Sequence, residues 1–383
     1  MKKALLFFLI IVLGSALIFG SCAKPAPAPP APAPPPAPAP APAPKPPPAP
    51  VPAPKPPPAP APVEPIKLAY ADAVPMESFT LKGMMVPWAE EIKAATNGRV
   101  EITIYAGGAL GRAHEEYDMV VKGVVDMACP RLDATAGRFP LSEYMSLPFL
   151  QSNARVAARV FDELLDKYCV ETELKDVKVL WVQSLVPLDL HVRTKPVHKL
   201  EDFKGMKIYS QGKVRNWTME ELGAVPVEMT APELYTSLER GLLDAATFSW
   251  SGILAFKLQE VTKYRTVCGL HALTWPVVMN LDTWEKLPPD IKKVIEERSG
   301  PERSESYGAA FDQLEIQLRK TVEGIDKKVG NPEVYDLPAA ERERWRKAAD
   351  PVYDRWVKEK EDMGLPGRKL LEDAEQLIIK YSK

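Results

Sequence analysis

The chain has little cysteine and histidine, with four residues of each among 383. The cysteines form no CxxC pair, and the histidines are scattered without the HExxH spacing of a zinc hydrolase. The GxSxG nucleophile motif and the GxxxxGKS phosphate-binding motif are also missing. These absences argue against the common hydrolases and nucleotide-dependent enzymes, so we expect no cofactor and no metal.

An excess of positive charge is missing as well. Residues 64–383 hold all 51 acidic residues and 44 of the 49 basic ones, which gives this part a formal charge of −7. We therefore expect no nucleic-acid partner. Cys129, Cys169 and Cys268 are odd in number and widely spaced, which is typical of buried small hydrophobic residues, with one disulfide as the alternative.

Residues 1–22 contain no acid and are typical of an export signal. Lys2 and Lys3 precede an apolar run over 4–19, and Gly20, Ser21 and then Cys22 follow it. This arrangement resembles a bacterial lipobox and predicts a lipidated Cys22. The alternative is an uncleaved anchor, although the apolar run is shorter than the roughly 20 residues that span a bilayer. Both place the rest of the chain outside the membrane, in the periplasm or at the cell surface.

Residues 23–63 are almost wholly Pro and Ala, with Lys24, Lys45 and Lys55 as their only charges. Proline fixes φ and removes an amide donor, so this segment predicts an extended polyproline II tether, not a folded domain. At about 3.1 Å per residue it reaches on the order of 120 Å. An SH3-type ligand is the less favoured alternative outside a bacterial membrane.

The remaining 320 or so residues are long for one core and suggest two lobes. Helical periodicity from Ser78 ends at Asn97-Gly98, with Pro87 expected to kink or divide the helix. A strand at 100–105, a helix at about 112–122 and a strand at 125–129 follow. A helix from Ser152 and a strand at 177–183 continue this βαβ rhythm of a parallel sheet.

The rhythm then repeats with a strand at 206–209, a helix at 213–222, a capping box at 230–233 and a strand at 243–248. Two successive α/β units favour two lobes that face each other across a cleft. Beyond a strand at 276–280 the chain is mostly helical. We expect a helical region over 289–329 interrupted at Gly300-Pro301 and Gly308, and helices at about 338–363 and 367–381 that brace both lobes.

A set of motifs, in their order and spacing, resembles the substrate-binding proteins of tripartite ATP-independent periplasmic (TRAP) transporters, the DctP-like family. The matching segments are WAEE (88–91), TNGRV (96–100), GGALG (107–111) with Glu116, GVVD (123–126), GRFP (137–140), LPF (147–149), KPV (195–197), EDFKGMKI (201–208), LGAVPVEM (222–229), ELYTSLERGLLD (233–244) and NLDTWEKLPPD (280–290).

This resemblance implies a two-lobed α/β fold like that of periplasmic binding proteins, with hinge strands and long bracing C-terminal helices. The expected first lobe spans 64–186 plus about 272–314, and the second about 187–271 plus about 315–383 with the C-terminal helices. The resemblance also implies a receptor that captures a small organic acid and delivers it to the small and large subunits of a membrane permease.

The sequence departs from the family at the position that matters most for an acid ligand. The family's Lys-Ile-Arg type of strand ends in an arginine that pairs with the ligand carboxylate, whereas here Tyr209 follows Lys207-Ile208. A buried charged partner of this kind contributes about 2 to 5 kcal/mol. A second acidic position of the family is also replaced, by Thr247, so a sodium or metal site like that of some relatives is not expected.

Other groups can take over the missing charge. Gln211 precedes a helix whose amides can receive an anion, and Tyr209 can donate a hydrogen bond. Arg131 follows a strand that should end at the cleft, and Arg215 lies in the first turn of the helix after Tyr209. Solvated surface positions are the alternatives for both arginines.

Aromatic residues complete the predicted site. Tyr70 follows the first strand and either packs in the core or lines the pocket, and Trp250 is the likelier pocket wall of the two. A pocket with aromatic rings and few charged side chains suits an aromatic, heterocyclic or larger acid better than a small dicarboxylate.

Two other classes stay open at this stage. One is a binding protein for a sensor kinase or an ATP-driven importer, and the other is an extracytoplasmic enzyme. The four histidines, His114, His191, His198 and His271, give the enzyme class little support because they are far apart. Neighbouring genes for a small and a large membrane subunit would select the TRAP transporter.

Overall fold

The computed structural model describes residues 64–135, 137–332 and 334–383. All described residues belong to one compact unit. The predicted signal, Cys22 and the whole predicted tether over 23–63 lie outside the described residues. Among the helices that are described, none combines the length and the apolar character that crossing a membrane requires.

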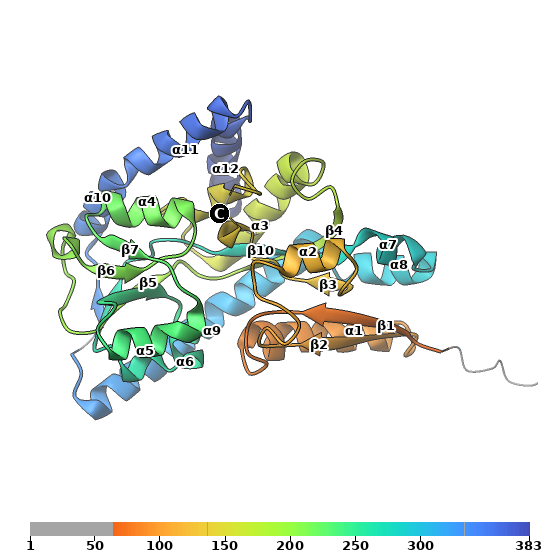
Figure 1. Ribbon diagram of the computed structural model, residues 1–383, viewed down its shortest axis with the longest axis horizontal. Coiled ribbons are helices and arrows are strands. Elements are labelled where there is room, and N and C mark those ends of the chain that lie inside the picture. Colours follow the sequence, from red (N-terminus) through yellow and green to blue (C-terminus); the bar gives the residue numbers. More distant parts are fainter. Residues whose placement is uncertain (1–63, 136, 333) are drawn as a thin grey trace, which may run out of the picture. The chain divides into compact units, whose positions relative to one another are not determined.

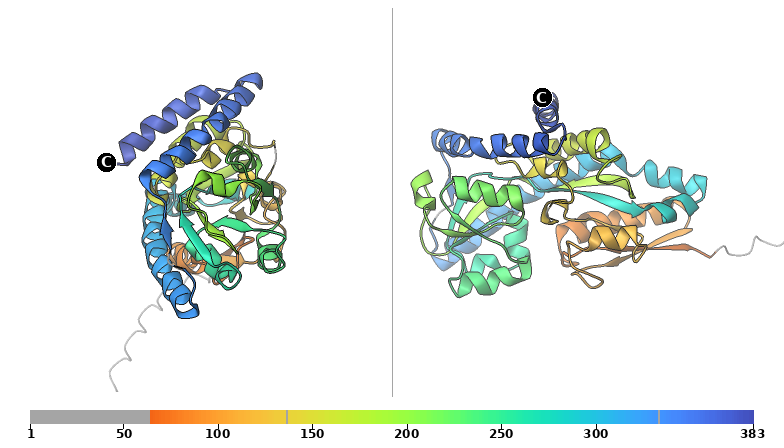
Figure 2. Two further views of the ribbon diagram at one scale, coloured as in Figure 1. Left: turned by 90° about the vertical axis from the view of Figure 1, so that its left-hand side faces the viewer. Right: turned by 45° about the horizontal axis from the view of Figure 1, so that its top comes forward.

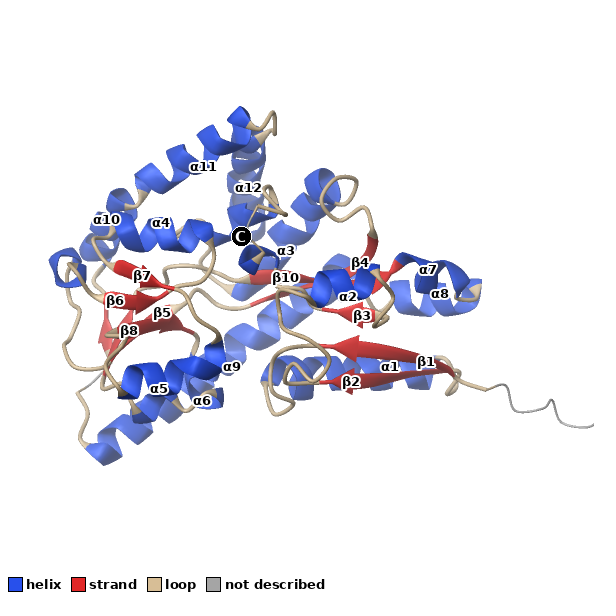
Figure 3. Cartoon of the chain, in the orientation of Figure 1, coloured by secondary structure: helices blue, strands red, loops and turns tan. Residues whose placement is uncertain are grey.

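The first sheet combines parallel and antiparallel strands (Figures 1 and 3). β1 pairs in parallel with β2 and β3, while β10 pairs antiparallel with β3 and β4. Its strands, in order across the sheet, are β2 (Val100–Tyr105), β1 (Ile66–Ala71), β3 (Met127–Ala128), β10 (Thr274–Asn280) and β4 (Val177–Ser184).

The second sheet is built from later segments of the chain. β6 pairs in parallel with β7 and β8, and β5 pairs antiparallel with β8 and β9. The chain passes between the sheets where β4 leads to β5 and where β9 leads to β10, so the two α/β lobes share hinge strands. The order is β11 (Tyr335–Asp336), β9 (Tyr264–Val267), β5 (Asp189–Val192), β8 (Ala245–Phe248), β6 (Lys207–Tyr209) and β7 (Val225–Val227).

Helices cover both sheets. The α-helices before the long bracing helix are α1 (Val86–Ala95), α2 (Glu116–Val121), α3 (Ala154–Leu164), α4 (Lys213–Glu221), α5 (Leu234–Glu239), α6 (Trp250–Ala255), α7 (Leu281–Lys286) and α8 (Pro289–Glu296). Short 3-10 turns lie at Leu132–Ala134, Ser142–Ser146, Leu200–Phe203, Ala231–Glu233 and Leu258–Glu260, and π-helical turns at Phe79–Met85 and Leu165–Cys169.

The helix is divided just before Pro87, as the sequence predicts. The helical run from Ser78 is divided into π-helical turns and then α1, and Pro87 lies in the first turn of α1, where its missing N–H is tolerated. Leu81, Trp88 and Ile92 face the core without exposure.

α9 (Gly300–Val329) is one uninterrupted helix, so the predicted break at Gly308 is wrong. Gly308 permits a close approach: a Cβ at this position would lie 2.5 Å from the carbonyl oxygen of Ala154 at the start of α3. α9 packs against α3 and β4 in the first lobe and against α6 in the second (Figures 1 and 2).

The C-terminal part forms α10 (Ala339–Ala348), α11 (Asp350–Asp362) and α12 (Gly367–Tyr381). The single helix predicted over 338–363 is therefore wrong, because Pro351 starts a new helix. Trp345 of α10 joins the core of the second sheet, whereas Trp356 of α11 joins a core of the first. These helices consequently brace both lobes, as expected.

The three cysteines within the described residues, Cys129, Cys169 and Cys268, are buried and unpaired. This confirms the prediction that they pack as small hydrophobic residues and rejects the disulfide alternative for these three.

Candidate functional site

The parallel register of the first sheet brings Asp72 and Arg131 together. Tyr70 pairs with Met127 and Ala71 with Ala128, so the residues that follow β1 and β3 leave the sheet at the same edge. Nη2 of Arg131 lies 2.9 Å from Oδ1 of Asp72. The Asp72 side chain is completely buried and that of Arg131 is 10% exposed, so this is a buried ion pair.

Arg131 is fixed by two further contacts. Its Nη1 donates to the carbonyl oxygen of Cys129 at 2.5 Å, and its guanidinium carbon lies 4.2 Å from the ring centre of Trp275 in β10. A guanidinium over an indole face is stabilised by the cation–π interaction. Arg131 is thus a held, buried charge and not a solvated loop residue.

Tyr70 belongs to the core of the first lobe and is not exposed. Its hydroxyl donates to Oδ2 of Asp72 at 2.9 Å, and the Val74 amide donates to Oδ1 of Asp72. Burial, followed by Asp72, raises the pKa of Tyr70 well above its usual range, so it remains a donor. In this arrangement Tyr70 orients Asp72, and a direct ligand contact by Tyr70 stays a prediction.

Glu116, at the start of α2, is a second buried acid beside this ion pair. Neither of its carboxyl oxygens has a hydrogen-bond partner among the described residues. Burial and then Asp72 raise the pKa of Glu116 well above its usual range, and Arg131 opposes the rise. The neutral form of Glu116 is therefore favoured.

Asp133 connects the two lobes. Its Oδ2 lies 2.9 Å from Nη2 of Arg215 in α4, and its Oδ1 accepts the indole N–H of Trp275 at 2.8 Å. Arg131, Trp275, Asp133 and Arg215 are consequently linked in sequence by direct contacts. We call these four residues the arginine–tryptophan chain.

Arg215 is buried but not fully satisfied. Its Nε has no partner among the described residues, and neither has Nε2 of His271, whose Nδ1 bonds the Ser146 carbonyl oxygen at 2.9 Å. Burial and then Arg215 lower the pKa of His271 to about 3, so this histidine is neutral. Arg215 thus keeps an Nε–H group that can donate a hydrogen bond. The neutral His271 adds no positive charge beside it.

Tyr209, which replaces the family arginine, is 4% exposed and packs beside Phe248. Its hydroxyl donates to Oε1 of Gln211 at 3.3 Å. Gly212, with φ of +90°, is the N-cap that precedes α4, and a Cβ there would lie 2.6 Å from the carbonyl oxygen of Asp133. Only a glycine permits both this φ and this approach of α4 to the loop after β3.

Trp250 has a different environment from the other predicted residues. Its indole N–H donates to Oδ2 of Asp189 at 3.0 Å, and its ring meets that of His191 edge-on at 5.1 Å between centres. Its backbone N–H donates to Glu315 of α9. These hydrogen bonds connect Trp250 with the start of β5 and with α9, and its role as a pocket wall stays a prediction.

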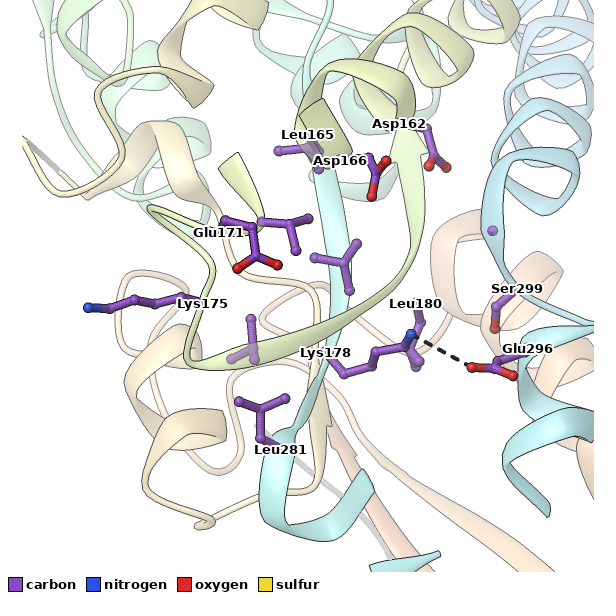
Figure 4. A pocket seen from close by; sticks show the side chains of 14 residues that line it. Asp162, Leu165, Asp166, Glu171, Lys175, Lys178, Leu180, Leu281, Glu296 and Ser299 are labelled. Atoms are coloured by element: carbon purple, nitrogen blue, oxygen red, sulfur yellow. Dashed lines mark ion pairs between the residues drawn. The ribbon is translucent and has the colours of Figure 1, made fainter. Parts of the chain in front are cut away.

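Several cavities among the described residues lie outside the arginine–tryptophan chain. One of about 450 Å³ is bordered by β4 and the start of α9, where Lys178 pairs with Glu296 (Figure 4). Two others, of about 560 and 400 Å³, adjoin the hinge and include Gln151, Gly269 and Arg342 in their walls. No cluster of His, Cys, Asp or Glu suited to a metal ion occurs in the part of the chain that the structure describes.

Sequence reasoning missed Asp72, Asp133 and Trp275, and it noted Glu116 only as part of a motif. Asp72 and Asp133 had a usable signal, since each follows a predicted strand of the first lobe at the end where ligands of α/β folds bind. Trp275 had no such signal, because it belongs to a hinge strand whose partner is distant in sequence.

Comparison with known proteins gives a consistent result. The profile described as "Bacterial extracellular solute-binding protein, family 7" (DctP) matches residues 70–360. The C4-dicarboxylate-binding periplasmic protein DctP of Rhodobacter capsulatus is 28% identical over 298 residues, which are 76% of this chain and 86% of that protein.

Two solved structures are similar over their whole length. A TRAP solute-binding protein from Rhodoferax ferrireducens, in complex with copurified benzoate, has a TM-score of 0.79 at 28% identity and covers 83% of this chain and 98% of its own. A marine metagenome TRAP protein specific for aromatic acids, with 3-hydroxybenzoate, has a TM-score of 0.79 at 30% identity and covers 84% and 100%.

Proposed function

This chain belongs to family 7 of the bacterial extracellular solute-binding proteins, the DctP family, and we propose that its ligand is an aromatic or similarly bulky monocarboxylate. As a TRAP solute-binding receptor it acts outside the cytoplasm and supplies an organic acid to a membrane permease. The family consists of transport receptors and not of enzymes, which removes the enzyme alternative.

The arginine–tryptophan chain is the observation that carries the proposal. It brings two guanidinium groups and one indole together from three separate segments, although the family arginine is replaced by Tyr209. A guanidinium is the best partner for a planar carboxylate, and Nε of Arg215 still lacks an acceptor within the described residues. Trp275 provides an aromatic face beside these charges.

The acids Asp72 and Asp133 already neutralise much of the two arginines' charge, so this region disfavours a second ligand carboxylate. One carboxylate with a large apolar group fits this balance better than a dicarboxylate does. The benzoate and 3-hydroxybenzoate complexes of the two similar proteins support the same class of ligand.

A thermal-shift screen of the protein tests this choice. Benzoate and 3-hydroxybenzoate should raise the melting temperature, whereas neutral benzamide and the dicarboxylate succinate should raise it less. A ligand at 100 times its Kd adds about 2.7 kcal/mol to the free energy of unfolding. A larger shift with succinate than with any aromatic acid contradicts the proposal.

Titration calorimetry on variants then assigns the contacts. We expect Arg131→Ala and Arg215→Ala each to cost about 2 to 5 kcal/mol of binding free energy, and Tyr209→Phe about 1 kcal/mol. If the ligand is neutral, the arginine variants are silent and Trp250→Ala has the largest effect through lost aromatic contact.

We further propose that residues 64–186 with about 272–314, and about 187–271 with about 315–383, act as lobes that close on the ligand. The support is the pair of hinge connections between the two sheets. Small-angle scattering at saturation with a confirmed acid should give a smaller radius of gyration than without it. An unchanged radius argues for a rigid receptor.

Finally, we propose that residues 1–22 are a lipoprotein signal, that Cys22 carries the lipid and that residues 23–63 tether the receptor to the membrane. Several acyl chains bind a bilayer far more firmly than the single chain that gives only marginal attachment. Cys22→Ser should leave the precursor unprocessed. Mass spectrometry of the membrane fraction checks this, and a mature protein that starts elsewhere contradicts it.

A further inference from the structure

Two cavities beside the hinge share part of their walls. The larger, of about 560 Å³, and the smaller, of about 400 Å³, are both bordered by Gln151, Ser152, Gly269 and Arg342. Gln151 follows Leu150, which packs against a core of the first lobe, Gly269 lies between β9 and β10, and Arg342 belongs to α10. These shared residues therefore come from different parts of the fold.

Most charges in these walls already have partners. Asp189 accepts the amides of Cys268 and Gly269 and the Trp250 indole. Asp312 accepts two amides at the start of α3, and Glu315 accepts two at the start of α6. The acids of the larger cavity are thus engaged with neutral N–H donors.

The arginines in these walls differ in whether they form ion pairs. Arg155 pairs with Glu305, and Arg319 pairs with Glu323 and Asp336. Arg342 makes no ion pair within the described residues and bonds only the carbonyl oxygen of Val267, at 3.3 Å. A guanidinium with a single weak neutral partner retains most of its donors for an anion.

Gln151 is the second unusual group. It is 5% exposed, and neither the nitrogen nor the oxygen of its side-chain amide has a partner within the described residues. Leaving a buried polar group unpaired costs about 1 to 3 kcal/mol, so a native structure normally supplies a partner for it. Nε2 of Gln151 needs a hydrogen-bond acceptor, and its Oε1 needs a donor close by.

We propose that Arg342 and Gln151 form a second binding site, at the hinge, for a small 2-hydroxycarboxylate. The carboxylate accepts from the guanidinium of Arg342 and from Nε2 of Gln151, and the neighbouring hydroxyl donates to Oε1 of Gln151. This site shares no residue with the arginine–tryptophan chain, so it does not depend on the identity of the transported acid. Because its residues belong to both sides of the hinge, an occupant favours one arrangement of the lobes.

Equilibrium dialysis of the full-length protein with radiolabelled glycolate tests the site, and neutral glycolamide is the matched control ligand. Glycolate should bind and glycolamide should not. Arg342→Met and Gln151→Leu should each weaken glycolate binding at least about tenfold. Arg344→Met is the matched control variant, since Arg344 lies on the same helix but pairs with Glu201 and Glu341.

Gln151→Leu also guards against a folding artefact, because it removes a buried unpaired amide and should not lower the free energy of unfolding. Equal glycolate binding by the wild type and both site variants overturns the proposal, and so does the absence of glycolate binding. Binding lost in Arg215→Met but retained in Arg342→Met assigns glycolate to the principal site and also overturns it. Failure of the aromatic-acid screen leaves these results unaffected.

Discussion

Arg131 and Arg215 are both buried arginines paired with one aspartate, but they are anchored differently. Arg131 and its partner Asp72 belong to the same lobe, and Tyr70 and Val74 hold Asp72 in place. Arg215 lies in the second lobe and reaches Asp133 in the first. The Arg131–Asp72 pair is buried within one lobe. The Arg215–Asp133 pair depends on how the two lobes are placed relative to each other.

This difference indicates different tasks for two similar side chains. Arg131 provides a charge that is positioned before any ligand arrives, because its guanidinium contacts with Asp72, Cys129 and Trp275 are all made within one lobe. In the proposed closure, Arg215 would move with its lobe, and its pairing with Asp133 would report that movement. Trp275 contacts both Arg131 and Asp133, so it connects the Arg131–Asp72 pair to the Asp133–Arg215 pair.

Removing Arg131 should have the largest effect on stability. Arg131→Met leaves the fully buried Asp72 without its counter-charge, and we expect the free energy of unfolding to fall by about 3 to 5 kcal/mol. Urea unfolding followed by tryptophan fluorescence measures this. Arg138→Met is the control, since Arg138 pairs with Asp118 on the surface. A loss below about 1 kcal/mol would show that Asp72 is not held as a buried ion.

Removing Arg215 should have a smaller effect on stability and a clearer one on shape. Arg215→Met should cost about 2 kcal/mol, because Asp133 keeps the Trp275 N–H. The double-mutant cycle with Asp133→Asn should give a coupling energy of about 1 to 3 kcal/mol. Small-angle scattering should also report a larger radius of gyration for the variant. A radius equal to that of the wild type would remove the distinction between a fixed and a movable arginine.

Tyr209→Phe should change stability by about 0.5 to 1 kcal/mol. The lost hydrogen bond to Gln211 is long, and the ring contacts with Phe248 are preserved. Thermal unfolding of the variant beside the wild type is the measurement. A loss as large as that of Arg215→Met would mean that Tyr209 carries part of the connection between the lobes.

Between pH 5 and pH 9, Glu116→Gln should have its smallest effect at pH 5, just above the unfolded-state pKa of a glutamate at about 4.3. The pKa of Glu116 is raised in the folded protein, so its contribution to stability is complete below the unfolded-state value and is lost as pH rises through the folded-state value. The glutamine variant lacks that loss and should become the more stable protein at alkaline pH. Urea midpoints from pH 5 to pH 9 check the sign. A variant that is less stable at high pH would identify Glu116 as an ionised partner of Arg131.

Much of the fold could be predicted from the sequence because its signals are local. Pro87, the apolar spacing after Ser78 and the strand at 100–105 each depend on neighbouring residues, and the structure contains the corresponding elements. Gly308 was misjudged for the same reason. Its effect on helix propensity is local, whereas its actual use, contact with the start of α3, is not.

The candidate site was predicted less completely. Tyr209 could be recognised as a departure because the flanking residues 201–208 fix its position in the family pattern. That Arg131 and Arg215 are buried, and that Trp250 bonds Asp189, depends on side-chain packing that no local pattern specifies. The direct ligand contacts of the six predicted residues accordingly stay predictions.

The sequence by itself determined the alternation of strands and helices, the family, and the loss of the family arginine at Tyr209, since each of these is written in contiguous residues. Only the tertiary structure decided which acid neutralises which arginine. Arg131 and Asp72 are 59 positions apart, Arg215 and Asp133 are 82 apart, and Trp275 and Asp133 are 142 apart. A charge in a sequence has many possible partners, and burial selects among them because an unpaired buried ion costs several kcal/mol.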